Sequence, residues 1–508
     1  MENMMESKVS GFLKEVMAPE IQAAFMAPVL FRSFAPALPL MSAINKAHVV
    51  MLEEQGILDQ AVAAELARVI LDLDEEGPSA FELDPAREDP YFNYEAEVIR
   101  RVGADVGGRM HVARSRNDLK ATQDRMRARH LAIKIMSEVQ EVRRVLIDQA
   151  GKYSDVVMPG YTHLQPAQPI TYGWYLLGVE SGLQRDFNRF SEAYSRLNLS
   201  PLGAGALAGT SFPINRDRTA CLLGFDGPAW HAQDAIACRD VIIELVAACT
   251  FLATTMGRMA QDFYNMTTYE FSTLDLPDSV AITSSIMPQK KNMAALENLK
   301  GRPAHLIGAL SSAFAAYKAV PYSHAQDGTS DSMRWVWDSL EEMALAVPAA
   351  RVVVSGAKPK PERMLELVRE NYSTATDLAD ALVREKGLSF REAHHVVGRV
   401  VRLAMERGLK ADEVGADLID QAAVETIGRA ASMSDEAARN ALDPVKAVLS
   451  REGTGGPSPN DVAALVEAAN SKHAEDSELL SRRVASLRAA EGELEKETKR
   501  LSGLASAA

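Results

Sequence analysis

The residues best suited to chemistry fall in three short polar segments, each beside an apolar stretch that favours a helix. The first segment contains Arg114, Ser115, Arg116 and Asn117. A guanidinium group matches a carboxylate through paired hydrogen bonds, and the neighbouring amide can add to its grip. This composition predicts a carboxylate-binding segment. A solvated basic turn ahead of a helix is the alternative interpretation.

The second segment, residues 160–169, holds Thr162 and His163 among prolines and glutamines. A catalytic histidine needs a neighbouring polar group that fixes its tautomer, and hydroxyl and amide groups are available here. The segment is also too irregular for an ordinary core element. It predicts either a catalytic histidine or a structural histidine whose hydrogen bonds are already satisfied.

The third segment, residues 283–292, places Ser285 and Lys291 in one loop, ahead of a helix that contains Glu297. Hydroxyl, ammonium and amide groups gathered in one short loop are costly to bury and unnecessary for a plain connection. Nearby positive charge lowers the cost of a developing alkoxide or enolate. The loop therefore suits chemistry that builds up negative charge, and a mobile loop tipped with lysines is the alternative.

The overall composition limits the possible partners. The chain has 508 residues and a net charge of −14, and 47% of its residues are hydrophobic. A negative field repels nucleic acid and anionic membranes, which leaves a small-molecule enzyme as the leading expectation. The sequence has no His-Glu-x-x-His motif, and glycine-rich residues 201–209 lack the lysine of a phosphate loop. We therefore expect neither a metal nor another cofactor.

The cysteines and the amino terminus predict a reduced, cytoplasmic protein. Cys221, Cys238 and Cys249 include no Cys-x-x-Cys pair. Charged residues interrupt positions 1–20, so the apolar core of a secretory signal is missing. The longest apolar stretch, residues 245–256, is shorter than the roughly 20 residues of a membrane span and fits a buried helix.

Helices must position the three segments, because helical periodicity dominates and strand-like alternation is almost absent. Residues 239–264 and 294–319 are long and apolar on more than one side, as expected for helices at the centre of a bundle. Ser389 and Glu392 have the spacing of a capping box, and Gly408 is placed to end the helix that follows. The fold class we predict is all-α.

Breaks in the helical pattern divide the chain into an amino-terminal domain (1–113), a central bundle (114–357), a carboxy-terminal domain (358–470) and a charged extension (471–508). A Lys-Pro-Lys-Pro linker starts the third part. The extension predicts a surface helix or a short coiled coil. Its heptad seam consists of Leu480, Val484, Leu487, Leu494 and Leu501.

Taken together, these motifs resemble the argininosuccinate lyase branch of the fumarase/aspartase superfamily. The similar stretches extend along most of the chain and are Met51–Ile57, Val106–Gly108, Ser115–Asp118, Gly160–Gln165, Pro201–Thr210, Ser284–Asn292 and Thr376–Asp380. The resemblance implies a three-domain fold, a central bundle of long helices shared in a homotetramer, and active sites built from three subunits. It also implies a dicarboxylate substrate and reversible anti elimination to fumarate and an amine.

The resemblance further implies which residues remove the proton and hold the carboxylates. Ser285 would be the base, with Lys291 and Asn292 stabilising the dianion that forms. The substrate carboxylates would be held by the polar residues of the first segment and one from the loop, namely Arg114, Ser115, Arg116, Asn117 and Gln289.

Two further roles come from the same resemblance. Thr162 and His163 would orient the succinyl part of the substrate, and His163 would form a charge pair with Glu297. Whether His163 also protonates the leaving nitrogen stays open. Arg239 matches a family arginine and would support the loop.

Several positions depart from the family pattern. Leu119 replaces a glutamine, Thr283 replaces a glycine before the two serines, and Met293–Ala294 replaces Pro-Asp. The family also has a run that receives the arginine part of argininosuccinate. An ungapped alignment on Pro321 places three different residues at the Tyr, Gln and Lys of that run, and these are His324, Thr329 and Ser332.

The fumarate-forming half is therefore intact, whereas the amine-recognising half is rebuilt. We expect a C–N lyase for an N-substituted L-aspartate of the aminopolycarboxylate type, such as ethylenediamine-N,N′-disuccinate. Argininosuccinate is the alternative substrate, because a shifted alignment lets Gln326 and Lys318 or His324 serve. A non-catalytic role, as in lens proteins recruited from this family, is a third interpretation, although the groups needed at the reacting carbons are all present.

Overall fold

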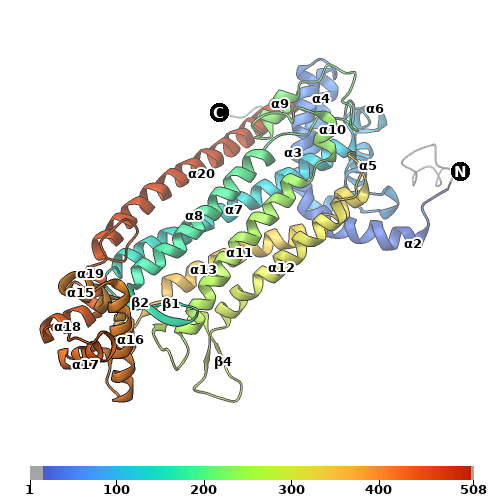
Figure 1. Cartoon of the computed structure of the whole chain (residues 1–508). Coiled ribbons are helices and arrows are strands. Elements are labelled where there is room, and N and C mark those ends of the chain that lie inside the picture. The colour runs from blue at the N-terminus through green and yellow to red at the C-terminus, as the bar shows by residue number, and fades with distance from the viewer. Residues whose placement is uncertain (1–14, 505–508) are drawn as a thin grey trace.

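A computed structural model describes residues 15–504, which form three large hydrophobic cores. The described part leaves out residues 1–14 and 505–508. The first of these ranges includes most of positions 1–20, which were predicted to lack a secretory signal. The largest core belongs to a central helical bundle, and the other two belong to an amino-terminal and a carboxy-terminal domain (Figure 1). The expected all-α, multi-domain fold is confirmed.

Five long helices form the central bundle, and they are α7 (Arg116–Lys152), α8 (Tyr172–Leu197), α11 (Asp240–Met266), α12 (Ala294–Tyr317) and α13 (Val336–Gly356). The two helices predicted at the centre of the bundle are α11 and α12, which pack against each other. Their small and aliphatic side chains enter the largest core, because both helices are apolar on more than one side.

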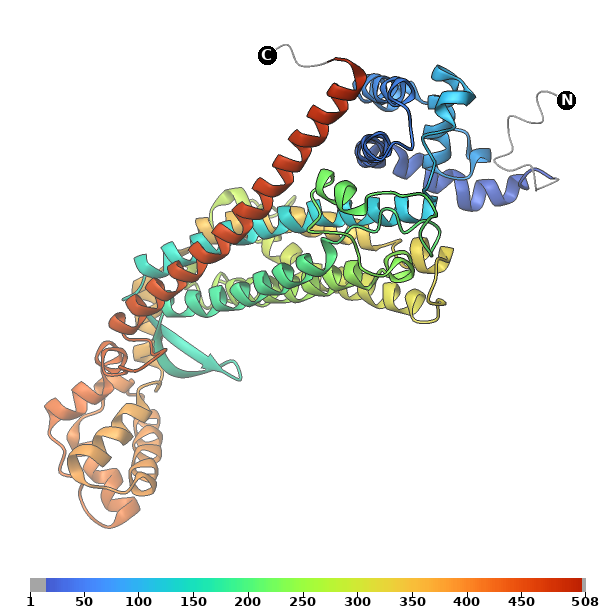
Figure 2. The same ribbon diagram turned by 90° about the horizontal axis from the view of Figure 1, so that it is seen from above.

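The helix lengths separate the two ends of the bundle. At a rise of about 1.5 Å per residue, the 37 residues of α7 extend about 55 Å and the 24 residues of α12 about 36 Å. The amino-terminal domain lies where α7 begins, and the carboxy-terminal domain lies beyond the point where α7 ends (Figure 2). We call these the amino-terminal end and the hairpin end of the bundle. Loops at opposite ends of one chain cannot meet.

The amino-terminal domain is built on three helices, α3 (Ala27–Glu54), α4 (Gln60–Glu76) and α5 (Pro90–Val102). Side chains of Asp59 and Asp89 cap the first turns of α4 and α5. Short elements complete the domain, namely α2 (Pro19–Ile21), the π-helical turn η1 (Gln22–Met26), η2 (Gly77–Ala80), η3 (Pro85–Arg87) and α6 (Ala104–Gly107). Two more helices, α9 (Arg216–Leu222) and α10 (Ala232–Ala237), lie in the connection between α8 and α11.

The carboxy-terminal domain consists of short helices: α14 (Pro361–Glu370), α15 (Ala375–Lys386), α16 (Phe390–Glu406), η6 (Ala411–Glu413), α17 (Ala416–Ile427), α18 (Asp435–Leu442) and α19 (Pro444–Leu449). The predicted capping box is confirmed, because Ser389 accepts from the Glu392 amide and the Glu392 carboxylate accepts from the Ser389 amide. Gly408 follows α16 with a φ of +67°, a backbone conformation that favours glycine.

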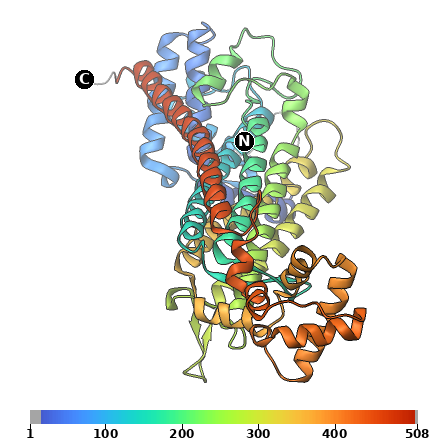
Figure 3. The same cartoon turned by 60° about the vertical axis from the view of Figure 1, so that its left-hand side comes forward.

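The last helix, α20 (Pro459–Ser502), runs continuously through the boundary expected at residue 471. It packs on α7 and α8 and then reaches α3, α4 and α9 of the amino-terminal part (Figure 3). Its seam residues Leu480, Leu487, Leu494 and Leu501 are buried. Arg143 of α7 pairs with Glu180 of α8 (2.8 Å) and with Asp476 of α20 (2.6 Å), which ties the three helices together. The three boundaries between the predicted parts stay predictions.

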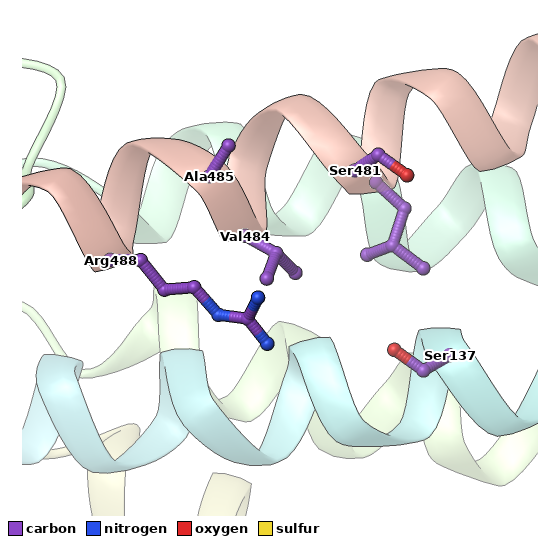
Figure 4. Close-up of a pocket in the computed structure, with 6 residues that line it drawn as sticks. Ser137, Ser481, Val484, Ala485 and Arg488 are labelled. Atoms are coloured by element: carbon purple, nitrogen blue, oxygen red, sulfur yellow. The ribbon is translucent and has the colours of Figure 1, made fainter.

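Val484, the remaining seam position, is partly exposed because α20 and α7 leave a pocket between them. Figure 4 shows Val484 and Arg488 of α20 pointing into this gap toward α7, and Ser481 of α20 and Ser137 of α7 also line the pocket. The heptad seam predicted from sequence therefore packs at four positions and lines a pocket at the fifth.

Three small antiparallel pairs interrupt the helical fold. β1 (Val157–Thr162) pairs with β2 (Gln165–Thr171), β3 (Leu274–Asp275) with β6 (Lys358–Pro359), and β4 (Ile282–Thr283) with β5 (Lys291–Asn292). Prolines and exposed polar residues hide the alternation in the β1–β2 hairpin, so periodicity did not predict it. The β6 strand shows that part of the predicted linker is anchored to the bundle.

Two helical stretches, Pro19–Glu54 and Asp240–Met266, are long and apolar enough to cross a membrane by length and composition alone. The second is α11, and half of its most apolar window is buried in the bundle. This packing agrees with the interpretation of residues 245–256 as a buried helix. Cys221, Cys238 and Cys249 are all free thiols.

Replacing Leu487 with alanine should destabilise the protein by about 2–4 kcal/mol, because the leucine is buried in the α20 seam against the backbone of Gly224. Thermal unfolding followed by circular dichroism measures the effect. Leu504→Ala is the matched control, since Leu504 is 59% exposed and its loss should leave the melting temperature unchanged. Equal melting temperatures for both variants would show that the seam does not hold α20.

Candidate active site

The predicted site residues divide between the two ends of the bundle. The amino-terminal end carries those at the start of α7 and beyond the end of α12: Arg114, Ser115, Arg116, Asn117, His324, Thr329 and Ser332. The hairpin end carries those of the β1–β2 turn, the β4–β5 loop and the start of α12: Thr162, His163, Ser285, Gln289, Lys291, Asn292 and Glu297 (Figure 1). A single chain therefore does not bring the predicted base to the predicted carboxylate-binding segment.

Asp118 fixes the first segment at the start of α7. The Ser115 hydroxyl accepts from the Asn117 amide (3.2 Å), and the Asp118 carboxylate accepts from the Ser115 amide (3.1 Å). The other carboxylate oxygen of Asp118 accepts from the amides of Gly203 (3.0 Å) and Gly205 (2.9 Å). Burial raises the pKa of Asp118 to about 6, although these hydrogen bonds oppose the rise. One carboxylate thus joins the segment to the glycine-rich loop.

The two arginines of this segment already have partners. Arg114 is buried and donates to the Tyr91 hydroxyl (2.9 Å), while its Nε and Nη1 lack partners in the described part of the chain. Arg116 Nη1 donates to Glu88 and Asp89, each at 2.9 Å. A substrate carboxylate must therefore share Arg116 with these two acidic groups or displace them.

The hairpin end presents His163 at the tip of a strained turn. The chain reverses between β1 and β2 through His163 and Leu164, whose φ angles are +53° and +58°. Two successive positive φ values define a turn that normally takes asparagine and glycine. Strain of this kind concentrates at functional sites. Both side chains are exposed, so the turn offers the imidazole to whatever approaches this end.

The serine–lysine loop spans residues 284–290 between β4 and β5. The Ser284 hydroxyl accepts from the amides of Ile286 (3.4 Å) and Met287 (3.0 Å), so it folds the turn. Ser285 and Gln289 are exposed, and the Ser285 hydroxyl makes no hydrogen bond to any described residue. Ile286 beside it is 82% exposed. The loop stands open, with an apolar side chain in solvent.

Lys291 and Glu297 are occupied within their own chain. The Lys291 ammonium is 2.9 Å from Asp278 and 3.7 Å from Asp275, and its hydrogen bond to Asp278 raises its pKa. It is therefore a permanent cation at neutral pH rather than a base. Glu297 accepts from the Tyr264 hydroxyl (2.9 Å). Within residues 15–504 of one chain, the predicted pairing of His163 with Glu297 is not formed.

The segment after α12 is anchored by α10. Gln233 donates to the Tyr322 carbonyl (2.7 Å), and the Tyr322 hydroxyl donates to Asp234. This anchor holds His324, which is partly buried, above the α10–α11 junction. Burial, and next the positive charge of Arg239, lower the pKa of His324, so its ring is neutral at physiological pH.

Thr329 and Ser332 are buried in and beside the π-helical turn η5 (Asp327–Asp331). Their hydroxyls donate to the carbonyls of Ala325 (3.0 Å) and Gly328 (2.6 Å), respectively. Their donors are thus used by the backbone, which leaves only acceptor positions for a ligand. Their role in substrate binding stays a prediction.

A charged cluster beside His324 was missed among the site residues. The Asp124 carboxylate lies 3.4 Å from Arg239 Nε and 3.8 Å from Lys120 Nζ. Arg116, Lys120 and Asp124 are spaced by four residues on α7, a pattern that places them on one face and could have identified two of them. The approach of Arg239 depends on packing between distant segments. Among the described residues, no group of three or more His, Cys, Asp or Glu side chains is placed to hold a metal ion.

Comparisons with known proteins agree on one family along the chain. Residues 20–308 match the family model described as Lyase, and residues 372–449 match the model described as Argininosuccinate lyase C-terminal. Argininosuccinate lyase 1 of Shouchella clausii is 37% identical over 471 residues, which cover 93% of this chain and 95% of the relative. Argininosuccinate lyase of Methanocaldococcus jannaschii is 38% identical over 416 residues, which cover 82% of this chain and 84% of the relative.

Solved structures give the same result. EDDS lyase in complex with formate superposes with a TM-score of 0.87 and 35% identity, covering 96% of this chain and 97% of that one. An EDDS lyase double variant with bound fumarate gives a TM-score of 0.86 over the same coverage. Fumarate lyase from Mesorhizobium sp. BNC1, at 19% identity and a TM-score of 0.69 (86% of this chain, 97% of that one), shares the fold.

The buried Asp118 makes a pH-dependent contribution to stability. Because its folded pKa of about 6 lies above the roughly 3.9 of a free aspartate, the folded protein binds this proton more tightly. The contribution is complete below pH 4 and is lost as the pH rises through 6, by up to about 3 kcal/mol. Asp118→Asn lacks this titration. The melting temperature of the wild type should therefore rise relative to that of Asp118→Asn as the pH falls from 7 to 5. A difference between the two melting temperatures that does not change with pH would refute the assignment.

Proposed function

The chain belongs to the argininosuccinate lyase branch of the fumarase/aspartase superfamily and is a carbon–nitrogen lyase; we propose that it catalyses reversible anti elimination of an amine from an N-substituted L-aspartate to give fumarate. The observation that carries the proposal is the division of polar groups between two sets. One set suits carboxylate binding, and the other suits removal of a proton. A weakly acidic C–H bond beside a carboxylate needs both.

The Cβ proton is weakly acidic because the carbanion is stabilised only as the aci form of the neighbouring carboxylate, which carries two negative charges. Preorganised donors must therefore surround that carboxylate. Lys291 supplies a permanent positive charge, and Asn292 and the loop amides supply hydrogen-bond donors. Ser285, as an alkoxide, takes the Cβ proton. The C–N bonding electrons leave with nitrogen, which acquires a proton and departs as the amine.

Serine is a poor base in water, so this step needs a loop that closes and excludes solvent. The open loop supports such a movement, because Ser285 makes no hydrogen bond to a described residue and Ile286 is left in solvent. Closing the loop would bury Ile286 together with Ser285. Thr162 and His163, at the tip of the strained hairpin, would orient the succinyl part, with Glu297 of another subunit as the partner of His163.

We further propose a homotetramer whose active sites combine segments of three subunits. Helices of the described chain leave large apolar side chains exposed along the bundle, and these are Phe251 on α11, Ile307 and Phe314 on α12, and Leu345 and Val352 on α13. Large apolar side chains exposed on three helices that pack together are expected where another chain covers them. Assembly would also bring a hairpin end against an amino-terminal end, which one chain cannot do.

The substrate we favour is an aminopolycarboxylate-type N-substituted aspartate rather than argininosuccinate. A family lysine that would meet the distal carboxylate is replaced by Ser332, whose hydroxyl donates to its own helix. His324 and Thr329 also differ from the family residues. EDDS lyase, at 35% identity over 96% of this chain, supports this choice.

Argininosuccinate is the second candidate, supported by curated relatives of that name at 37% and 38% identity. Gln326 and Lys318 remain near the altered run in sequence and could serve the arginine part. A cytoplasmic location is part of the proposal in either case, because all three thiols are free.

Ser285→Ala should reduce fumarate release by about 100- to 10,000-fold, because it removes the base, while sedimentation still shows the assembled enzyme. Ser284→Ala is the matched control, since Ser284 only folds the turn and its loss should have a smaller effect. Turnover that survives Ser285→Ala, or that depends on Ser284 instead, would contradict the assigned base. A protein with no turnover at all would favour the non-catalytic interpretation.

Ethylenediamine-N,N′-disuccinate should be cleaved with a higher kcat/KM than argininosuccinate, followed as the absorbance of released fumarate. If no other cation takes the place of the missing lysine, its loss should cost argininosuccinate roughly 2–5 kcal/mol of binding. Efficient cleavage of argininosuccinate, with none of the disuccinate, would establish the second candidate instead.

A further inference from the structure

A cluster of basic residues lies beside the predicted site at the amino-terminal end of the bundle. It consists of Lys120 on α7, Arg239 at the start of α11 and His324 after α12. Lys120 and Arg239 share the Asp124 carboxylate at 3.8 and 3.4 Å. Burial lowers the pKa of His324, and the positive charges of Arg239 and Lys120 lower it further. Three segments that are distant in sequence thus converge on one place.

Arg239 has more donor capacity than its own chain uses. Its side chain is only 2% exposed. Nη1 donates to the carbonyls of Ile236 (3.2 Å) and Cys238 (2.8 Å), and Nε faces the Asp124 carboxylate at 3.4 Å, whereas Nη2 has no hydrogen-bond partner in the described part of the chain. The buried Nδ1 of His324 is unpartnered as well. Buried donors are normally satisfied, so these groups indicate a missing acceptor.

The charge balance of the cluster selects the acceptor. Lys120 and Arg239 face one carboxylate, Asp124, which leaves one positive charge uncompensated. Arg116, whose positive charge also lowers the pKa of His324, is already paired with Glu88 and Asp89. Lys120 is 41% exposed, so its ammonium can meet a ligand that arrives from solvent. An anionic ligand of about one negative charge fits this arrangement.

The geometry around the cluster is held in place. The Tyr317 hydroxyl accepts from the Arg239 amide (3.3 Å), which ties the end of α12 to the start of α11. Gln233 and Asp234 hold Tyr322 two residues before His324. Because both sides of the cluster are fixed by backbone-linked contacts, it is preorganised for a ligand.

We propose that Lys120, Arg239 and His324 form a subsite for a carboxylate carried by the amine half of the substrate. This inference rests on the proposed function and deepens it. The carboxylate would bind Lys120 and the free Nη2 of Arg239, and His324 would donate from a ring nitrogen. The subsite would thereby take over the task of the family lysine that Ser332 replaces, using cations from α7 and α11 instead.

The test compares fumarate addition to β-alanine and to β-alaninamide, which differ in the carboxylate. The wild type should prefer β-alanine by at least about tenfold in kcat/KM, and Lys120→Met should reduce this preference to below about threefold. Lys134→Met is the matched control, because Lys134 is exposed on the same helix about 21 Å away. Intrinsic reactivity of the two amines cancels when the ratios of different proteins are compared.

A binding measurement separates failure of the subsite from failure of the proposed reaction. Iminodiacetate has no β-carbon and cannot be eliminated, so calorimetry reports its Kd without turnover. Lys120→Met should weaken this Kd at least about fivefold, whereas Lys134→Met should not change it. An unchanged Kd and an unchanged amine preference in Lys120→Met would overturn the subsite. Weakened binding without turnover of any amine would retain the subsite and refute the reaction.

Discussion

The rigid length of the bundle helices is the constraint on which the rest of this structure depends. Backbone hydrogen bonds hold the ends of α7 about 55 Å apart and those of α12 about 36 Å apart. The carboxylate-binding segment starts α7 and the histidine hairpin follows its end, while the serine–lysine loop precedes α12 and His324 follows it. Within one chain the two halves stay apart, so the proposed reaction requires that they meet between chains.

In a single chain, the main cation of each half is already paired with acidic side chains. Arg116 lies between Glu88 and Asp89, and Lys291 lies between Asp275 and Asp278. Such pairing stabilises isolated cations near a surface, but it must be exchanged when substrate carboxylates arrive. Asp118 has a different role. Its buried carboxylate accepts hydrogen bonds from backbone amides and thereby fixes the position of the carboxylate-binding segment. A substrate with two carboxylates would offer Arg116 and Lys291 new acidic partners in exchange for those of their own chain.

Sequence reasoning identified the helices and the chemistry-bearing segments but not their arrangement. Long apolar runs and the Ser389 capping box predicted helices because these signals are local. The β1–β2 hairpin was hidden by prolines, and no local signal shows that His163 adopts a positive φ. The cluster of Lys120, Arg239 and His324 joins residues at least 85 positions apart, and only packing between helices brings them together. The acidic partners of Arg116 and Lys291 likewise lie outside the sequence motifs, and folding brings them into contact.

Co-refolding of two inactive variants tests the shared site most directly. Ser285→Ala disables the hairpin end and Asn117→Ala disables the amino-terminal end, so a mixed assembly contains some sites in which both ends are intact. If sites form between chains, activity absent from either variant alone returns on mixing, to a substantial fraction of the wild-type rate. If mixing under conditions that form hybrid assemblies restores no fumarate release, each site lies within one chain and the proposal of a shared site is wrong.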